Sequence, residues 1–238
     1  VIDIGNTFTK LAIFEANKLI KTVIENQINE SIITSFVSEY KIKKGIFSTV
    51  SNDKVELDLL KKYNFLRLST STPLPIKINY ETPQTLGIDR LSAVVGAHIK
   101  YQNTPILVVD MGTCLTYDFL DDNAVYFGGS ISPGFQMRFN ALSYYTDKLP
   151  LISFKNQTPQ LIGNSTEASI VSGVFKGIEA EINGIIQHYL KQYPKLKIVV
   201  TGGDVNRFDL EPKNRIFADE FLVLNGLNEI LNFNDKIN

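Results

Sequence analysis

The most regular feature of the hydrophobic pattern is an apolar run that ends in Asp-x-Gly and resumes after a short turn. In residues 106–119, ILVVDMGTCLTYDF, the first run ends at Asp110 and the turn contains Gly112 and Thr113. Two strand-like runs around a small-residue turn predict a β-hairpin. Its turn would expose backbone N–H groups and one carboxylate.

The beginning of the chain carries the same pattern. In residues 1–12, VIDIGNTFTKLA, Asp3 takes the place of Asp110 and Gly5 the place of Gly112. One Asp-x-Gly hairpin is weak evidence of any function. Two copies, each opening one half of the chain, indicate a duplicated domain with an acidic, phosphate-accepting turn in each half.

The remaining patterns alternate between strands and helices, as in an α/β protein. A buried strand is predicted to deliver Gly202-Gly203 to its carboxyl end, and a long helix is expected from an N-cap at Asn164 to about Leu190. Its glycines predict a close approach of another segment, since glycine lowers helix stability. We expect two domains, residues 1–104 and 105–238.

Composition excludes several classes of protein. The 238 residues are 44% hydrophobic and have a formal net charge of −1, so we expect globular domains and no nucleic-acid partner. No uncharged apolar run reaches the roughly 18 residues of a membrane helix, and Asp3 in the first strand pattern argues against a signal peptide. The single cysteine, Cys114, suits a reducing compartment, so we expect a cytoplasmic protein. Because the first residue is Val, we expect one or more residues upstream.

The two turns and Gly202-Gly203 suit the binding of a nucleotide. Glycines let backbone N–H groups approach phosphate oxygens, because a Cβ atom would hold them away. Asp3 and Asp110 would repel a polyphosphate, so they make sense only with cations between them and the ligand. Gly202-Gly203 would let an adenine or ribose lie flat against the backbone.

Six motifs, in their order along the chain, resemble those of type III pantothenate kinases. They are DIGNT (3–7), GIDR (87–90), DMGTCLTYD (110–118), GGSISPG (128–134), GNST (163–166) and TGG (201–203). The resemblance covers nearly the whole chain, and the GIDR box, preceded by Tyr80, distinguishes this family from the rest of the superfamily. Met111 and Cys114 depart mildly from the family pattern without removing a functional group.

The resemblance implies an α/β fold of duplicated ribonuclease-H-like domains, of the actin-like ATPase or acetate and sugar kinase/Hsp70 superfamily, with a nucleotide cleft between them. It implies ATP-dependent phosphorylation of pantothenate to 4'-phosphopantothenate, the first step of coenzyme A biosynthesis. The cofactors would be Mg²⁺ with ATP and a monovalent cation, K⁺ or NH₄⁺. The enzyme would be a homodimer.

The resemblance also assigns residues. Asp89 would be the catalytic base, and Asp110 would hold the monovalent cation. The ATP-binding residues would be Asp3, Ile4, Gly5, Asn6, Thr7, Phe8, Thr9, Lys10, Thr113, Gly202 and Gly203. The pantothenate-binding residues would be Tyr80, Gly87, Ile88, Asp89, Arg90 and, from the neighbouring subunit, Thr166.

Other interpretations of single residues stay open at this point. Asp89 could simply be the N-cap of the helix that follows it, and Tyr80 could only pack. Thr166 could be only a first-turn helix residue, and Lys10 a solvated strand residue.

Two other functions compete with the leading one. The chain could be a kinase of the same fold with a different hydroxyl acceptor, or a nucleotide-binding accessory or regulatory protein that has lost catalysis. A missing Asp3, Asp89 or Asp110 would have indicated lost catalysis, and all three are present.

Overall fold

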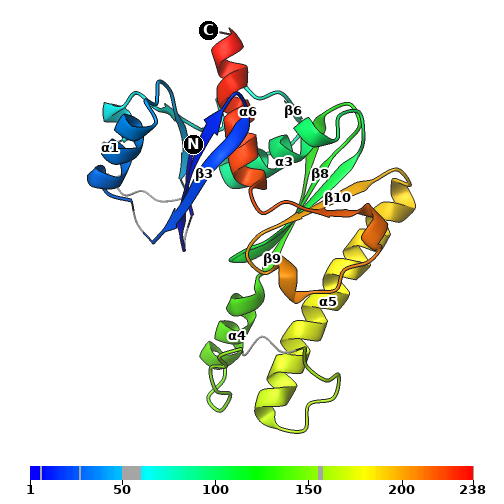
Figure 1. The fold of residues 1–238 in the computed structure, drawn as a ribbon. Helices are drawn as coiled ribbons and strands as arrows, with labels where there is room; N and C mark the ends of the chain where they lie inside the picture. Colours follow the sequence, from blue (N-terminus) through cyan, green and yellow to red (C-terminus); the bar gives the residue numbers. More distant parts are fainter. Residues whose placement is uncertain (6, 27, 50–59, 155–157, 238) are drawn as a thin grey trace. The chain divides into compact units, whose positions relative to one another are not determined.

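The computed structural model describes residues 1–5, 7–26, 28–49, 60–154 and 158–237 (Figure 1). Its contacts define two compact units. Unit 1 comprises Val1–Gln102, Ala124–Tyr126 and Phe221–Asn238, and unit 2 comprises Asn103–Asn123 and Phe127–Glu220. Packing therefore groups the last helix with the first half of the chain, whereas a division at 104/105 would assign it to the second.

Unit 1 is built on a five-stranded sheet in the order β3-β2-β1-β4-β5. Strands β1 (Ile2–Ile4), β2 (Thr9–Glu15) and β3 (Lys18–Glu25) are antiparallel, whereas β4 (Ile46–Thr49) and β5 (Leu66–Arg67) continue the sheet in parallel. Helix α1 (Glu30–Glu39) begins after Asn29, whose side chain accepts the N–H of Ile32. Apolar residues of the sheet and α1 form one core, including Ile4, Ile33 and Phe47.

Helices α3 (Ile88–Lys100) and α6 (Leu222–Ile237) pack together at two glycines in unit 1. A Cβ atom at Gly226 would overlap the carbonyl oxygen of Ser92, and one at Gly96 would overlap that of Leu222. The two backbones thus touch where neither helix has a side chain. This contact fixes α3, which carries the GIDR box in its first turn.

The second sheet has the order β11-β10-β7-β8-β9-β6. Its strands are β6 (Lys77–Ile78), β7 (Ile106–Met111), β8 (Cys114–Leu120), β9 (Val125–Pro133), β10 (Lys197–Thr201) and β11 (Ile216–Ala218). β7 and β8 form an antiparallel hairpin, and β10 lies parallel to both β7 and β11. Short 3-10 turns lie at Pro83–Thr85, Val205–Arg207 and Lys213–Arg215.

The order of strands repeats between the two sheets. In each sheet a hairpin strand, β1 or β7, has its antiparallel partner on one side and a parallel strand, β4 or β10, on the other. A further parallel strand, β5 or β11, follows at the edge. The predicted α/β fold with two Asp-x-Gly hairpins is confirmed, and the repeated topology is what a duplication would produce.

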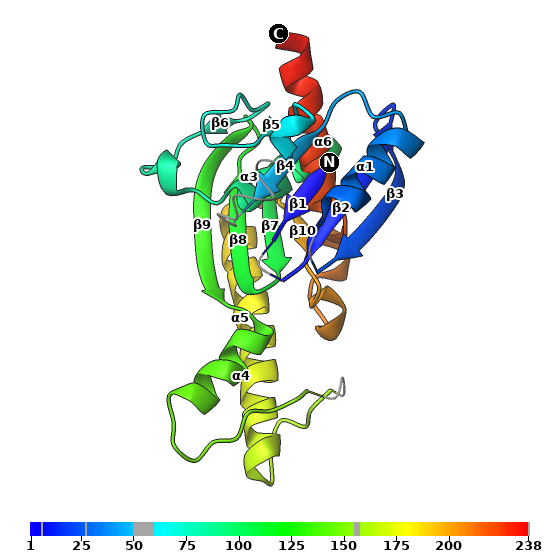
Figure 2. The same ribbon diagram turned by 90° about the vertical axis from the view of Figure 1, so that its left-hand side faces the viewer.

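In unit 2 the helix α5 (Thr166–Gln192) covers the sheet, and α4 (Phe135–Tyr144) lies beside its N-terminal half (Figure 2). Ile178, Ile182 and Ile186 join the apolar side chains of β7, β8 and β10 in one core. The predicted N-cap was wrong by one residue, because Ser165 accepts the N–H of Ala168.

The glycines of α5 make no close approach within the described part of the chain. A Cβ atom at Gly173, Gly177 or Gly184 would meet nothing within 4 Å. Among the described residues no helix is long and apolar enough to span a membrane.

Candidate active site

The first Asp-x-Gly turn joins β1 to β2 in unit 1. The N–H of Gly5 donates to the carbonyl of Phe8 over 3.1 Å and closes the turn. Gly5, Thr7 and Phe8 are exposed, whereas the side chains of Ile4 and Thr9 are buried, so only the backbones of those two can face a ligand. Asn6 lies outside the described residues. The turn thus offers a short exposed segment of backbone.

Asp3 lies at the base of this turn, opposite Lys10 of β2 and Ser48 of β4. The hydroxyl of Ser48 donates to Oδ1 of Asp3 over 2.5 Å. Burial raises the pKa of Asp3 above its ordinary value, and the charge of Asp89 adds to this increase, whereas the bond from Ser48 and the charge of Lys10 lower it. Lys10 thus lies opposite Asp3 in the sheet, and the charge of Asp89 acts on the same carboxylate.

Asp89 lies in the first turn of α3, but it is not the N-cap, because Gly87 holds that position. Its Oδ1 accepts the backbone N–H of Arg90 over 2.8 Å, which leaves Oδ2 without a hydrogen-bond partner among the described residues. A Cβ atom at Gly87 would lie 2.6 Å from Oδ1 of Asp89. Glycine before this aspartate leaves room for the carboxylate.

Apart from Thr166, the other residues of the predicted pantothenate site lie in the same unit as Asp89. Arg90 is buried and has an interaction partner within the protein. The ring of Tyr80 packs at a tilt against that of Tyr126, with 6.2 Å between ring centroids, and is half-buried. Ile88 is the first residue of α3.

The second Asp-x-Gly turn joins β7 to β8 in unit 2. A Cβ atom at Gly112 would lie 3.4 Å from Oδ1 of Asp110, and one at Gly202 would lie 2.6 Å from the same oxygen. Gly202 follows β10, whose Thr201 pairs with Asp110, and its φ of +100° favours glycine. The structure thus brings Asp110 and Gly202 together, as the sequence predicted for one site.

Thr113 is exposed in this turn, and Gly134 lies directly against it. The N–H of Gly134 donates to the carbonyl of Thr113 over 3.2 Å. A Cβ atom at Gly134 would overlap the carbonyl oxygens of Gly112 and Thr113. Gly203 is exposed and has nothing within 4 Å of a Cβ position, so its backbone is open to a ligand.

Thr166 is exposed at the first position of α5 in unit 2, whereas Tyr80 and Asp89 belong to unit 1. Among the residues that the structure describes, no group of three or more His, Cys, Asp or Glu side chains could hold a metal ion. A cation at either turn would therefore depend on one or two carboxylates together with backbone or ligand oxygens.

Three residues that contact the predicted site residues were missed by the sequence analysis. Ser48 binds Asp3, Gly134 supports Thr113, and Tyr126 packs on Tyr80. The strand that ends in Ser48 was recognisable as buried, and Gly134 lies in the GGSISPG motif. Their contacts with the site arise only from the pairing of strands far apart in the sequence.

Comparisons with known proteins find relatives over the full length of the chain. The family model for type III pantothenate kinase matches residues 1–188. A type III pantothenate kinase of Phocaeicola vulgatus is 46% identical over 241 residues, which covers 100% of this chain and 99% of that protein.

Solved structures show the same fold. A Campylobacter jejuni protein described as a Baf family transcriptional activator is 26% identical, with a TM-score of 0.59, and the match covers 99% of this chain and 98% of that one. A ROK family glucokinase from Streptomyces griseus, 10% identical, has a TM-score of 0.53 over 98% of this chain and 97% of its own. The predicted actin-like fold is thus shared with a sugar kinase. The family match and the identity over the full length show that this chain belongs to the type III pantothenate kinase family.

Proposed function

We propose that this protein transfers the γ-phosphoryl group of ATP to the primary hydroxyl of pantothenate, with Asp89 as the base. The products are ADP and 4'-phosphopantothenate, so the reaction begins coenzyme A biosynthesis. The observation that carries the proposal is that Asp89, in the first turn of α3, belongs to the same unit as the first Asp-x-Gly turn and that its charge acts on Asp3. An acceptor-site carboxylate and a turn that can bind phosphate thus belong to one unit.

Asp89 needs little basicity for this role. Phosphoryl transfer passes through a loose transition state in which the attacking hydroxyl is only weakly activated. Oδ1 of Asp89 is held by the N–H of Arg90, and Oδ2 is available to orient the hydroxyl and accept its proton late in the reaction. Most of the rate enhancement then comes from alignment and from neutralising charge on the phosphates.

Both Asp-x-Gly turns would contribute residues to ATP binding. In unit 1 the backbone around Gly5, together with Asn6, Thr7 and Lys10, would contact phosphate oxygens. In unit 2 Thr113 would contact phosphate, and the open backbone at Gly202-Gly203 would lie near the nucleoside. Mg²⁺ bound to ATP would neutralise charge beside Asp3, whose burial already disfavours a bare carboxylate.

Asp110 would hold the monovalent cation, K⁺ or NH₄⁺. Its carboxylate has Gly112 and Gly202 as neighbours, and the missing Cβ atoms leave backbone close to the oxygen. Backbone carbonyls and one carboxylate suit a cation of low charge density better than a cluster of carboxylates would. The cation would spread phosphate charge during transfer.

Pantothenate is itself an anion, and Arg90 would meet its carboxylate. The planar guanidinium suits a carboxylate, and its burial fixes its orientation. Tyr80, Gly87 and Ile88 would line the remainder of the acceptor site. Tyr126, which packs on Tyr80, would hold that ring in place.

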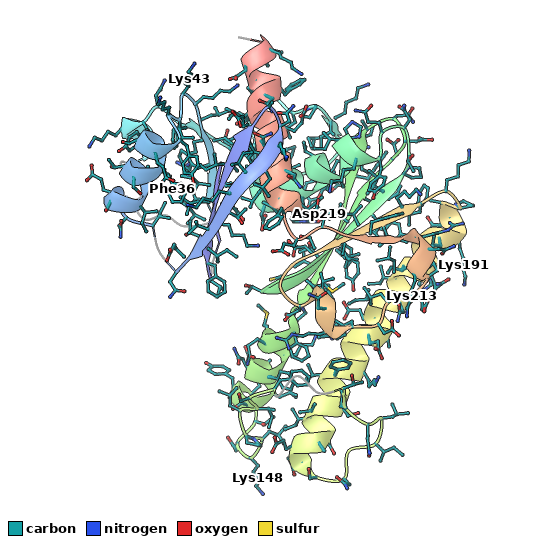
Figure 3. The ribbon with its side chains drawn as sticks, in the orientation of Figure 1. Phe36, Lys43, Lys148, Lys191, Lys213 and Asp219 are labelled. Carbon is teal, nitrogen blue, oxygen red and sulfur yellow. The ribbon has the colours of Figure 1, made fainter. Side chains whose placement is uncertain are left out.

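A homodimer would complete the acceptor site with Thr166 of the neighbouring subunit. Unit 2 exposes apolar side chains near α4 and the start of α5, including Tyr144, Tyr145 and Leu161, which are 83%, 81% and 76% exposed. Lys148 lies in the loop that follows α4 (Figure 3). Aromatic and aliphatic groups this exposed are typical of an interface.

The remaining expectations are part of the same proposal. The enzyme would work in the cytoplasm, where ATP is available and the free thiol of Cys114 stays reduced. With a net charge of −1 it would have neither nucleic acid nor a membrane as a partner. Residues 1–104 and 105–238 would be the duplicated halves, with the last helix packing on the first.

Replacing Asp89 by Asn preserves its shape but removes the proton acceptor. We expect kcat to fall by about 100-fold or more, the usual contribution of a general base. The fold should persist, because an amide oxygen can still accept the N–H of Arg90. Pantothenate-dependent ADP release and a thermal melt measure both effects.

Asp209→Asn is the matched control, because the Asp209 side chain is 75% exposed and pairs only with Lys213 among the described residues. It should leave turnover unchanged. Near-normal turnover of Asp89→Asn would remove Asp89 as the base.

Replacing K⁺ by Na⁺ in the assay buffer tests the cation site at Asp110. We expect pantothenate-dependent ADP release to need K⁺ or NH₄⁺, because Na⁺ is smaller and fits a site of fixed oxygens poorly. Asp110→Asn should reduce the rate in K⁺ and abolish the difference between the salts. Equal wild-type rates in K⁺ and Na⁺ would refute the assignment, and release without pantothenate would point to another acceptor.

Asp3→Asn should change the stability of the protein and its binding of ATP in different directions. Burial raises the pKa of Asp3, so the folded protein binds the proton more tightly than the unfolded chain. The stability of the wild type should therefore fall as the pH rises from about 4 through the raised pKa. The amide has no such pH dependence. The free energy of unfolding of the variant should therefore increase relative to that of the wild type as the pH rises toward neutral.

Urea unfolding of both proteins at several pH values measures this difference. ATP binding by the variant should be weakened at the same time, as ligand titration would report. A difference in unfolding free energy that stays constant with pH would contradict the burial of a charged Asp3.

The double variant Tyr145→Ser/Leu161→Ser tests the homodimer. The wild type should sediment with twice the mass of one chain, and the variant should shift toward one chain because it loses apolar contact area. Its activity should fall with the dimer, since Thr166 would be missing from each site. Lys191→Ala, near the C-terminal end of α5 (Figure 3), is the control. A monomeric, active wild type would refute this interface.

A further inference from the structure

Glu181, in the middle of α5, links two other elements of unit 2. Its Oε2 accepts a hydrogen bond from Nη2 of Arg138 on α4, over 2.5 Å. Its Oε1 accepts one from the hydroxyl of Tyr117 on β8, over 3.2 Å. The side chains of Arg138 and Glu181 are only 22% and 25% exposed, so solvent screens this ion pair less than it would a surface pair.

Arg138 also holds the end of β9. Its Nη2 donates to the hydroxyl of Ser132 and its Nε donates to the carbonyl of Pro133, both over 2.8 Å. The guanidinium therefore spans from the carboxylate of Glu181 to the Ser132–Pro133 segment. Only arginine offers several donors in one rigid plane, so lysine could not make all these bonds at once.

The segment held by Arg138 continues into the second Asp-x-Gly turn. Gly134 follows Pro133, donates its N–H to the carbonyl of Thr113 and lies too close to Gly112 and Thr113 for a Cβ atom. The backbone of Gly134 therefore packs directly against the backbone of Gly112 and Thr113, with no side chain between them. A shift of Ser132–Gly134 would therefore move the turn that carries Thr113.

Tyr117 links Glu181 to the strand β8 of the same hairpin. It is fully buried in β8, the strand that follows the turn. Burial raises the pKa of its hydroxyl, and the charge of Glu181 raises it further, so the hydroxyl stays protonated and remains a donor. Glu181 thus fixes both the strand after the turn and, through Arg138, the segment packed against the turn.

We propose that Arg138 and Glu181 are positioning residues for ATP: they hold Ser132–Gly134 against Gly112 and Thr113, so that the second turn keeps the geometry its phosphate contact needs. The inference rests on the proposed contact between Thr113 and ATP. Neither residue touches a substrate in this scheme. Their effect passes through the backbone of Gly134.

The conservative variants Arg138→Lys and Glu181→Gln test the proposal in the full chain. Lysine keeps the charge but loses the planar set of donors, and glutamine keeps the bond from Tyr117 but loses the ion pair. We expect kcat/KM for ATP to fall by about 10- to 100-fold, the scale of a misplacement of up to 1 Å. The KM for pantothenate should stay unchanged, because the acceptor residues Tyr80 and Asp89 belong to unit 1.

Glu179→Gln is the matched control. Glu179 forms a similar ion pair with Lys176, over 2.9 Å, with side chains 22% and 30% exposed, and this pair lies within α5 itself. If Arg138 and Glu181 had a purely structural role, Arg138→Lys, Glu181→Gln and Glu179→Gln would all have a lower melting temperature but an unchanged kcat/KM per folded enzyme. That result, or an equal loss of activity in Glu179→Gln, would overturn the proposal.

Thr113→Val separates failure of this inference from failure of the ATP assignment. If Thr113→Val raises the KM for ATP but Arg138→Lys and Glu181→Gln do not, the turn binds ATP and the positioning role is wrong. If Thr113→Val has no effect on ATP, the assignment of the turn is wrong and the inference falls with it. The expected result is a lower kcat/KM for ATP, with an unchanged KM for pantothenate, in Thr113→Val, Arg138→Lys and Glu181→Gln.

Discussion

Repulsion between negative charges is the constraint on which the site depends. In unit 1 the charge of Asp89 adds to the raised pKa of Asp3, and ATP would bring several more negative charges. The negative charge is partly offset by local groups: the hydroxyl of Ser48, the ammonium group of Lys10 and the backbone N–H groups of a glycine turn. They do not neutralise such a charge, so a kinase built this way depends on cations that arrive with or beside the nucleotide.

Glycine gives the site its second property, close contact between backbones. Gly87 makes room for the Asp89 carboxylate, Gly202 for that of Asp110, and Gly134 lets one segment lie on another. Each of these glycines belongs to a motif that was visible in the sequence. In each case the requirement is a missing Cβ atom, and only Gly202 also needs a positive φ.

The sequence was sufficient for the parts of the structure that local patterns determine. The two hairpins, the buried strands and the helix after GIDR were predicted because apolar periodicity and turn residues specify them. The start of α5 was missed by one residue, because Asn164 and Ser165 are equally good N-caps and only the backbone decides between them. The bond from Ser48 to Asp3 and the clamp by Arg138 could not be predicted, since both depend on tertiary pairing. The comparisons establish the family, while the roles of individual site residues stay predictions.

The glycine contact between α3 and α6 has a consequence for how the enzyme is made. The helix that carries Asp89 is synthesised early, whereas its packing partner is encoded much later in the chain. During translation the face of α3 that packs on α6 therefore stays exposed until α6 has left the ribosome. A contact between such distant segments is slow to form, so the acceptor site would be one of the last parts of a nascent molecule to become competent.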